Sequence, residues 1–482
     1  MAKLSKKKFK QLSEKLSPEK KSVWDQADAA QRREIMKLGE RYKEFLDAAK
    51  TERMAVKTIL ARARAKGFKA CKPGVKAKRL YFNYKGKVVA LAVLGRRSPV
   101  GGMRLIGAHL DAPRLDLKMN PLYEDQEMVF LKTHYYGGIK KYQWLSRPLA
   151  IHGVVCTGDG RSVEVHIGDG EGDPVFTVLD LLPHLSRRTQ ENKKLSEAVE
   201  AERMNLLIGT LPLDADDGRD RVKLAVLKLL NDNYGITEPD LISAELELVP
   251  AGKARDVGLD RSLVGGYGQD DRASAFAALE AVLSVKDPAL TCVALFLDKE
   301  EIGSEGATGA QSRFLERLAA SLLEAAGEQA AYRQVFRGLA ASQMLSADVN
   351  AAYNPDYPEV HEKRNAAFLG YGVCLSKYTG HGGKYGASDA DAEYVAWLRK
   401  VWDDAGVVWQ AAGMGKVDQG GGGTIAKFMA VYGMDIIDVG PSMLAMHSPF
   451  EISSKADMLS SFMAYRAFYQ APPMKQPAGR TI

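Results

Sequence analysis

The stretch LTCVALFLDKEE, residues 290–301, decides the fold class of this chain of 482 residues. Its first eight residues are almost wholly apolar, as expected of a strand that is buried on both faces, and the run ends in charged residues. Similar apolar runs at 103–108, 343–347 and 434–439 alternate with helical patterns at 272–284, 389–405 and 456–469. This alternation predicts an α/β fold with a mixed, mostly parallel sheet flanked by helices.

The sequence changes character between about residues 121 and 250. Short β-like runs recur there, at 127–133, 149–156, 162–167 and 244–249, and the loops are rich in Gly and Asp. We therefore predict a discontinuous domain of residues 1–120 and 251–482, interrupted by a smaller β-rich domain of residues 121–250. The Gly-Asp run at 168–173 lacks the glutamate that a calcium-binding loop carries at its twelfth position, so calcium is not favoured.

The N-terminal part combines a basic tail with helical periodicity. Apolar residues recur at helical spacing over 23–66, and a hairpin pattern follows at 79–93. The net charge is +7, and lysines among the first 21 residues supply part of that excess. Because no aromatic residue except Phe9 interleaves with these lysines, we interpret the stretch as a solvated, frayed tail and expect no nucleic-acid partner.

Composition excludes several classes of protein. Hydrophobic residues make up 46% and charged residues 26% of the chain, which is typical of a globular protein. There is no apolar run of about 18 residues, so we expect no membrane partner. The N-terminus lacks the apolar segment of a secretory signal, and the cysteines form no CxxC pair, so we predict a cytoplasmic location.

Acidic residues and histidines follow the predicted strands. Those that stand just after a strand, or at a strand-to-helix turn, are His109, Asp270, Glu300, Glu301, Asp348 and His447. Ligands of open α/β sheets gather outside the carboxyl ends of the strands, so we expect these side chains to converge. Each has a structural alternative when taken singly, because acidic pairs before a helix also cap its N-terminus.

Together these residues suit a hydrolase with two metal ions. Such a site needs a bridging carboxylate and terminal ligands for each ion. Asp270 can bridge, because a carboxylate has two oxygens. His109 and Asp348 can complete one site, and Glu301 and His447 the other. Mixed imidazole and carboxylate donors fit two Zn²⁺ ions per subunit, with Mn²⁺ or Co²⁺ as alternatives.

The remaining residues of the constellation have supporting roles. Glu300 is left free to act as the general base. Asp111 lies two residues after His109 and can accept the second ring N–H of that histidine. A serine nucleophile is disfavoured because the chain has no Gly-x-Ser-x-Gly elbow. The glycines at 420–423 lack the Lys-Ser/Thr of a phosphate loop, and we expect them to bring the backbone close to the metal centre or substrate.

Segments around these residues resemble the M18 family of metallo-aminopeptidases, the aspartyl aminopeptidase or aminopeptidase I group. In the family's order they are GAHLDAPR (107–114), GQDDR (268–272), EEIGS (300–304), SAD (346–348) and LAMHS (444–448). The resemblance covers nearly the whole chain. It implies a fold of the zinc exopeptidase type, the same assignment of five metal ligands and a base, and peptides as substrates.

The resemblance also implies an assembly and a substrate preference. The family typically forms homo-oligomeric dodecamers, in which a histidine of the inserted domain reaches a neighbouring active site, and the matching residue is His184. Lys377 or Lys384 is the candidate partner of an acidic (Asp or Glu) N-terminal residue. The motif HLDAP at 109–113 differs from the HTDSP of several aspartyl aminopeptidases. A neutral or basic preference, a related dipeptidase or deacylase, and a non-catalytic assembly protein therefore stay open as alternatives.

Overall fold

The computed structural model describes residues 5–474 except 18, 73 and 215–217. Within these ranges the largest sheet has nine strands. Their order is β1 (Lys69–Ala70), β2 (Arg79–Tyr84), β3 (Val88–Val93), β14 (Thr291–Leu297), β4 (Met103–His109), β15 (Gln343–Ser346), β19 (Asp435–Gly440), β17 (Val373–Ser376) and β18 (Trp409–Ala411).

The four strands at the centre of this sheet run in one direction. β14 pairs with β4 in parallel, β4 with β15, and β15 with β19, while β3 and β17 are antiparallel neighbours at either side. The carboxyl ends of the four parallel strands therefore lie along one edge, which is the edge where the sequence predicts the site.

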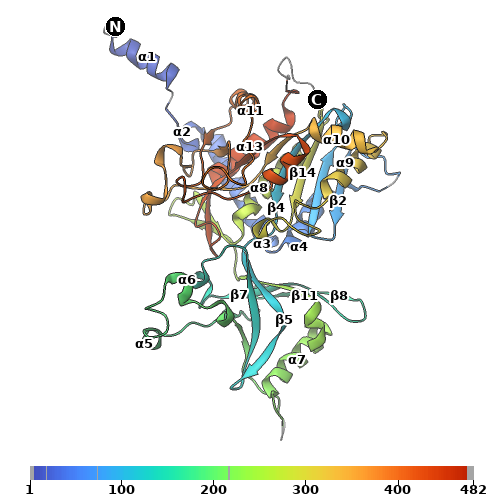
Figure 1. The fold of residues 1–482 in the computed structure, drawn as a ribbon, viewed down its shortest axis with the longest axis vertical. Helices are drawn as coiled ribbons and strands as arrows, with labels where there is room; N and C mark the ends of the chain where they lie inside the picture. The colour runs from blue at the N-terminus through green and yellow to red at the C-terminus, as the bar shows by residue number, and fades with distance from the viewer. Residues whose placement is uncertain (1–4, 18, 73, 215–217, 475–482) are drawn as a thin grey trace.

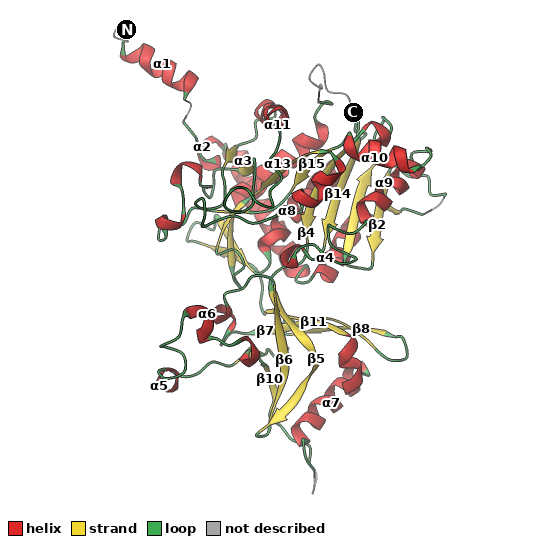
Figure 2. Cartoon of the chain, viewed as in Figure 1, coloured by secondary structure: helices red, strands yellow, loops and turns green. Residues whose placement is uncertain are grey.

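Helices cover both faces of the large sheet (Figure 2). One face carries α3 (Ala29–Ala48), α4 (Glu52–Ala65), α8 (Gln269–Ser284), α11 (Ala392–Asp404) and α13 (Lys455–Gln470), and the other carries α9 (Phe314–Ala325), α10 (Tyr332–Ala340) and α12 (Ala426–Met429). Successive residues of β3 alternate between the two cores, with Val89 and Leu91 in the first and Val88 and Ala90 in the second. The predicted α/β fold class is confirmed.

The predicted helix over 23–66 is divided into three. These helices are α2 (Val23–Gln26), α3 and α4. The breaks have a local cause, because polar side chains before α3 and α4 cap the free N–H groups of the next helix. Asp28 accepts from the N–H of Gln31, and Thr51 accepts from the N–H of Met54. Periodicity alone did not show these caps.

The basic N-terminal stretch is helical where the structure describes it. α1 (Lys6–Leu16) begins after the capping residue Ser5 and buries none of its side chains, so the stretch is solvated and has a helical conformation (Figure 1). Residues 1–4, which include Lys3, lie outside the described part. Within the described ranges, no helix combines the length and apolar character that a membrane span requires.

A second sheet is built from the middle of the chain and lies below the first in Figure 1. In the described residues its seven strands are β8 (Ser162–Ile167), β7 (Leu149–Cys156), β11 (Ala244–Pro250), β5 (Arg114–Asp125), β6 (Met128–Tyr136), β10 (Leu206–Gly209) and β9 (Thr177–Val178). The helices α5 (Pro183–Ser186), α6 (Leu195–Ala198) and α7 (Arg221–Tyr234) accompany it. It has its own core, around Trp144 and Leu248. The predicted boundary at 121 falls inside β5, and the one at 250 falls at the end of β11.

A small third sheet lies beside the large one. Its order in the described residues is β12 (Arg255–Val257), β13 (Leu263–Gly266), β21 (Glu451–Ser454), β20 (Ser442–Leu444) and β16 (Asn350–Ala351). It links the segment before α8 to the segments that follow β15 and β19, because β13 pairs with β21 and β16 pairs with β20.

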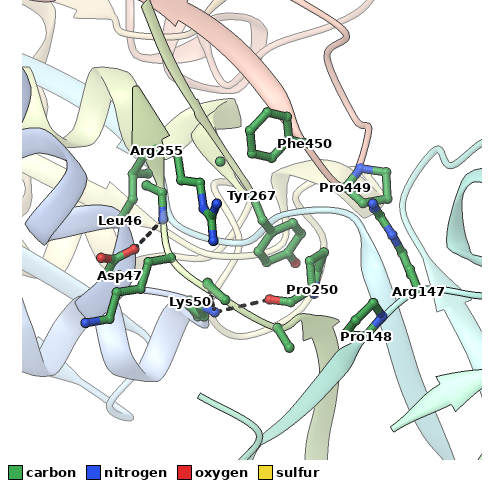
Figure 3. Close-up of a pocket in the computed structure, with 15 residues that line it drawn as sticks. Leu46, Asp47, Lys50, Arg147, Pro148, Pro250, Arg255, Tyr267, Pro449 and Phe450 are labelled. Atoms are coloured by element: carbon green, nitrogen blue, oxygen red, sulfur yellow. Dashed lines mark hydrogen bonds between the residues drawn. The ribbon is translucent and has the colours of Figure 1, made fainter. Parts of the chain in front are cut away.

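Lys50, in the turn between α3 and α4, connects the part of the molecule built around the nine-stranded sheet to the part built around the seven-stranded sheet. Its ammonium group lies 2.6 Å from the carboxylate of Asp169 and also donates to the carbonyl oxygens of Pro250 and Gly252. A cavity of about 180 Å³ opens at this junction (Figure 3). The side chains of Arg147 and Tyr267 are among those that line it.

Candidate metal centre

The six predicted site residues come from five separate segments that the fold brings to one edge. His109 ends β4, Asp270 lies in the first turn of α8, and Asp348 follows β15. Glu300 and Glu301 form a short 3₁₀ turn (Glu300–Ile302) after β14, and His447 follows β20. The parallel direction of β14, β4 and β15 places three of these segments side by side.

One group of three possible ligands is formed by His109, Asp270 and Asp348, whose ligand atoms lie within 4.8 Å of one another. The Nε2 atom of His109 is 3.3 Å from Oδ1 of Asp270 and 3.9 Å from Oδ1 of Asp348. His109 is buried, and its other ring nitrogen, Nδ1, lies 2.9 Å from the carbonyl oxygen of Asp111. That contact orients Nε2 toward the two carboxylates.

A second group is formed by Asp270, Glu301 and His447, again with ligand atoms within 4.8 Å of one another. The Nε2 atom of His447 is 3.1 Å from Oδ2 of Asp270 and 3.4 Å from Oε2 of Glu301. The Nδ1 atom of His447 lies 2.8 Å from the carbonyl oxygen of Gly138, which follows β6 of the second sheet. A carbonyl oxygen only accepts, so Nδ1 of this ring carries the proton and Nε2 keeps a lone pair that can bind a metal.

The two groups share Asp270, and each group contains a different oxygen of its carboxylate. Oδ1 faces His109 and Oδ2 faces His447. The donor set of imidazole nitrogens and carboxylate oxygens suits zinc. The Oε1 atom of Glu301 is buried without a hydrogen-bond partner, although such atoms are normally satisfied. An ion held by these residues would satisfy that oxygen, so the residues present fit a metal.

The pKa values in the cluster also support a bound cation. Burial and the negative charge of Asp270 raise the pKa of Glu301 well above its usual value. Burial and the charge of Asp271 do the same to the pKa of Asp348. Buried carboxylates thus outnumber the imidazoles beside them, and divalent cations would offset this excess of negative charge.

Asp111 organises the site mainly through the backbone of the two glutamates. Its carboxylate accepts the N–H groups of Glu300 and Glu301, each at 3.1 Å, and the hydroxyl of Tyr136 at 2.8 Å. The nearest acceptor for the ring N–H of His109 is the carbonyl of Asp111, because its carboxylate oxygen lies farther away, at 3.4 Å. The predicted link between His109 and Asp111 is present, with the main chain in the closer position.

Glu300 lines the cavity of the site, next to both ligand groups. Burial raises the pKa of its carboxyl to about 7, because the charges of Asp111 and Asp270 add to the effect of burial while His109 opposes it. The sequence positions of Glu300 and Glu301 are adjacent, but only Glu301 belongs to a ligand group. Glu300 is therefore the carboxylate of the pair that lies outside both ligand groups.

The cavity beside the cluster has a volume of about 200 Å³. Gly421, Gly422 and Gly423 form part of its wall, in keeping with the expectation that these glycines let the backbone approach the site. At Gly421, which has a φ of +114°, a Cβ atom would lie 1.7 Å from the carbonyl oxygen of Gly380. A side chain cannot be accommodated there, so this close approach requires glycine.

Three residues predicted from the sequence are not brought to the cluster. The ammonium groups of Lys377 and Lys384 both pair with Asp389, at 3.7 and 2.7 Å, and neither lysine lines the cavity. His184 is exposed on α5, which accompanies the second sheet and lies far from the upper body in Figure 1. Within one chain it therefore does not contribute to the site.

Sequence reasoning missed several residues that shape the site. Asp438 is buried within β19, lines the cavity and accepts a hydrogen bond from the hydroxyl of Thr424. The available signal was that two acidic residues, Asp435 and Asp438, interrupt the otherwise apolar run at 434–439. Tyr136 and Gly138 had no comparable signal, because their roles depend on contacts with distant segments.

Comparisons with known proteins agree with this geometry. The family model described as aminopeptidase I zinc metalloprotease (M18) matches residues 45–469. The probable M18 family aminopeptidase 1 of Clostridium acetobutylicum is 48% identical, over 94% of this chain and 98% of that protein. The crystal structure of the M18 aminopeptidase of Thermotoga maritima has a TM-score of 0.90 at 48% identity, with 94% and 99% of the two chains covered. The mApe1 dodecamer of S. cerevisiae is 22% identical and shares the fold, with a TM-score of 0.72 over 90% and 96% of the chains.

Proposed function

The chain belongs to the M18 family of zinc metallo-aminopeptidases, and from this premise we propose that it removes N-terminal residues at a site for two zinc ions. The observation that carries the proposal is the position of Asp270, whose two oxygens face two different histidines. His109 and Asp348 would hold one ion with it, and Glu301 and His447 the other. Bound zinc would supply Lewis acidity to the scissile carbonyl and to water.

Glu300 would move the proton that hydrolysis requires. As the general base it would accept a proton from the attacking water and deliver it to the nitrogen of the leaving amine. Its main chain is fixed by the carboxylate of Asp111, so the base and the neighbouring ligand Glu301 have defined positions. This preorganisation supports the role, because proton transfer requires hydrogen-bond distances.

The substrate preference is the second part of the proposal. An acidic N-terminal residue would require a cation in the cavity, but its lining includes no lysine or arginine among the described residues. Instead the wall carries the buried Asp438 and the amide of Asn350. Lys377 and Lys384 are paired with Asp389 outside the lining. This arrangement favours a neutral or basic N-terminal residue over the acidic one.

Self-assembly is the third part. The second sheet and its loops would join copies of the chain into a homo-oligomer, as in the yeast relative that is described as a dodecamer. Leu181, Leu182 and Leu185 are all more than two-fifths exposed, beside His184. Neighbouring exposed apolar side chains indicate a protein-binding surface. Association there would bring His184 to the active site of a neighbour.

Metal depletion and a panel of aminoacyl substrates test the proposal. Protein depleted of metal by chelation should be inactive, and zinc should restore hydrolysis with two ions bound per chain at saturation. Chromogenic substrates with Leu, Lys, Asp and Glu would then define the preference. Full activity in a verified metal-free sample would overturn the two-metal site, whereas turnover only of Asp and Glu substrates would overturn the preference alone.

A further inference from the structure

Two histidines face each other on the hairpin formed by β7 and β8, outside the catalytic cluster. His152 and His166 are directly paired across the two strands. Their Nδ1 atoms are 3.2 Å apart, and the ring centroids are 5.3 Å apart. Neither residue belongs to the ligand groups around Asp270.

The ring of His152 is held by a carboxylate. Its Nε2 atom lies 2.7 Å from Oδ2 of Asp169, and only 3% of its side chain is exposed. The other oxygen of Asp169 accepts from the ammonium group of Lys50, at 2.6 Å, and from the N–H of Gly252, at 2.9 Å. Both oxygens of Asp169 act as acceptors, so Nε2 of His152 carries the proton. The lone pair of Nδ1 then points toward His166.

The Nε2 atom of His166 also lies near a carboxylate. Oε2 of Glu164 lies 3.6 Å from the Nε2 atom of His166, and the same oxygen is fixed by the ammonium group of Lys57 at 2.8 Å. The side chain of His166 is 41% exposed, so solvent reaches its part of the pair. A proton on Nε2 of His166 would leave a lone pair on its Nδ1 atom. That lone pair would face the Nδ1 atom of His152.

We propose that His152 and His166 bind a divalent transition-metal ion through their Nδ1 atoms, with water completing its coordination. Zinc–nitrogen distances of about 2.0–2.1 Å place two ligand nitrogens of a tetrahedral site about 3.3 Å apart. The observed separation of 3.2 Å fits that geometry without any movement of the strands. A histidine whose second nitrogen donates to a carboxylate is also the usual form of a metal ligand.

The donor type defines the class of ion. Two imidazoles suit Cu²⁺, Ni²⁺ and Zn²⁺, and Cu²⁺ is expected to bind most tightly of the three. A competing explanation is a plain hydrogen bond, in which one ring donates its Nδ1–H to the other. The two explanations differ in whether the pair takes up an ion.

Such an ion would strengthen the junction between the two bodies of the molecule. His152 is linked through Asp169 to Lys50, whose contact with Pro250 is drawn in Figure 3. A ligand that binds only the folded protein raises its stability in proportion to the logarithm of its concentration. The metal would therefore hold β7, β8 and the turn after α3 in one arrangement.

The test uses the full-length, zinc-loaded protein, dialysed against micromolar Cu²⁺ and analysed for bound metal. His166→Gln should bind one copper ion fewer than the wild type and keep its aminopeptidase activity. His134→Gln, which changes an exposed histidine of β6 in the same sheet, is the matched control and should bind as the wild type does.

Two further measurements keep the result decisive. Asp169→Asn should weaken the extra copper site about 10–100-fold, because it removes the carboxylate that orients His152. Electron paramagnetic resonance of the wild type should show a copper signal, with coupling to two nitrogens, that His166→Gln lacks. Equal copper content and equal spectra in the wild type and His166→Gln, with both active, would overturn the proposal and leave the hydrogen bond.

Discussion

Replacing each of the adjacent glutamates by glutamine separates proton transfer from metal binding. Glu300→Gln preserves the volume of the side chain and the N–H of residue 300 that donates to Asp111, so the fold should be kept. It removes only the capacity of the side chain to accept a proton, which is the capacity that a general base needs. Glu301→Gln instead removes charge from the oxygen that lies 3.4 Å from Nε2 of His447, in the second ligand group.

The expected magnitudes differ accordingly. General-base catalysis is typically worth about 10²–10⁴ in rate. At 1.36 kcal/mol for each factor of ten, Glu300→Gln should raise the activation barrier by about 2.7–5.4 kcal/mol. Glu301→Gln should lower both the metal content and the rate, because one ion loses a charged ligand. Its thermal stability should also fall, since binding to the folded state contributes to stability.

Metal analysis and steady-state kinetics on both variants provide the assay. Glu300→Gln should retain two zinc ions per chain and a near-normal KM, with kcat reduced by the factor above. Glu301→Gln should hold about one ion per chain at the same free zinc concentration. If Glu300→Gln lost an ion while Glu301→Gln kept both, the roles assigned to the pair would be reversed.

Four shorter predictions follow from the same geometry. Exhaustive chelation should abolish turnover and lower the melting temperature, and zinc should restore both; unchanged melting would contradict a metal within the fold. His184→Ala should reduce kcat without changing metal content, which a fully active isolated monomer would disprove. Lys377→Ala and Lys384→Ala should leave the ratio of Glu to Leu hydrolysis unchanged, and a selective loss of Glu hydrolysis would show that one of them contacts an acidic substrate. Tyr136→Phe removes the hydroxyl that donates to the buried Asp111, so the free energy of unfolding measured in urea should fall by about 1–3 kcal/mol. An unchanged midpoint of urea denaturation would argue against that hydrogen bond.

The sequence was most informative where one local pattern determines the outcome. The apolar runs of β14 and β4 predicted strands buried on both faces, and residues following those runs were predicted to meet at one edge. His109 and Glu301 could be placed there without any knowledge of the loops, because the direction of parallel strands fixes the edge.

The rest depended on contacts that no local pattern encodes. Tyr136 lies in β6 of the second sheet, yet its hydroxyl contacts Asp111 at the edge of the first. Lys377 and Lys384 follow β17, as a substrate-binding residue would, but both turn toward Asp389. A difference of a few ångströms in loop conformation decides whether such a side chain lines the cavity, and residue type alone does not determine that conformation.

The carbonyl of Gly138 has a consequence for attempts to transplant parts of this molecule. It belongs to the segment that leads out of β6, but it fixes the ring of His447, which lies 309 positions later in the chain. A chimaera that joined residues 120 and 251 by a short linker would keep all five side chains proposed as metal ligands and lose the contact that orients one of them. The segment of residues 121–250 is therefore not a detachable module. Substitutions around Gly138 and around His447 would have to be made, or to evolve, together.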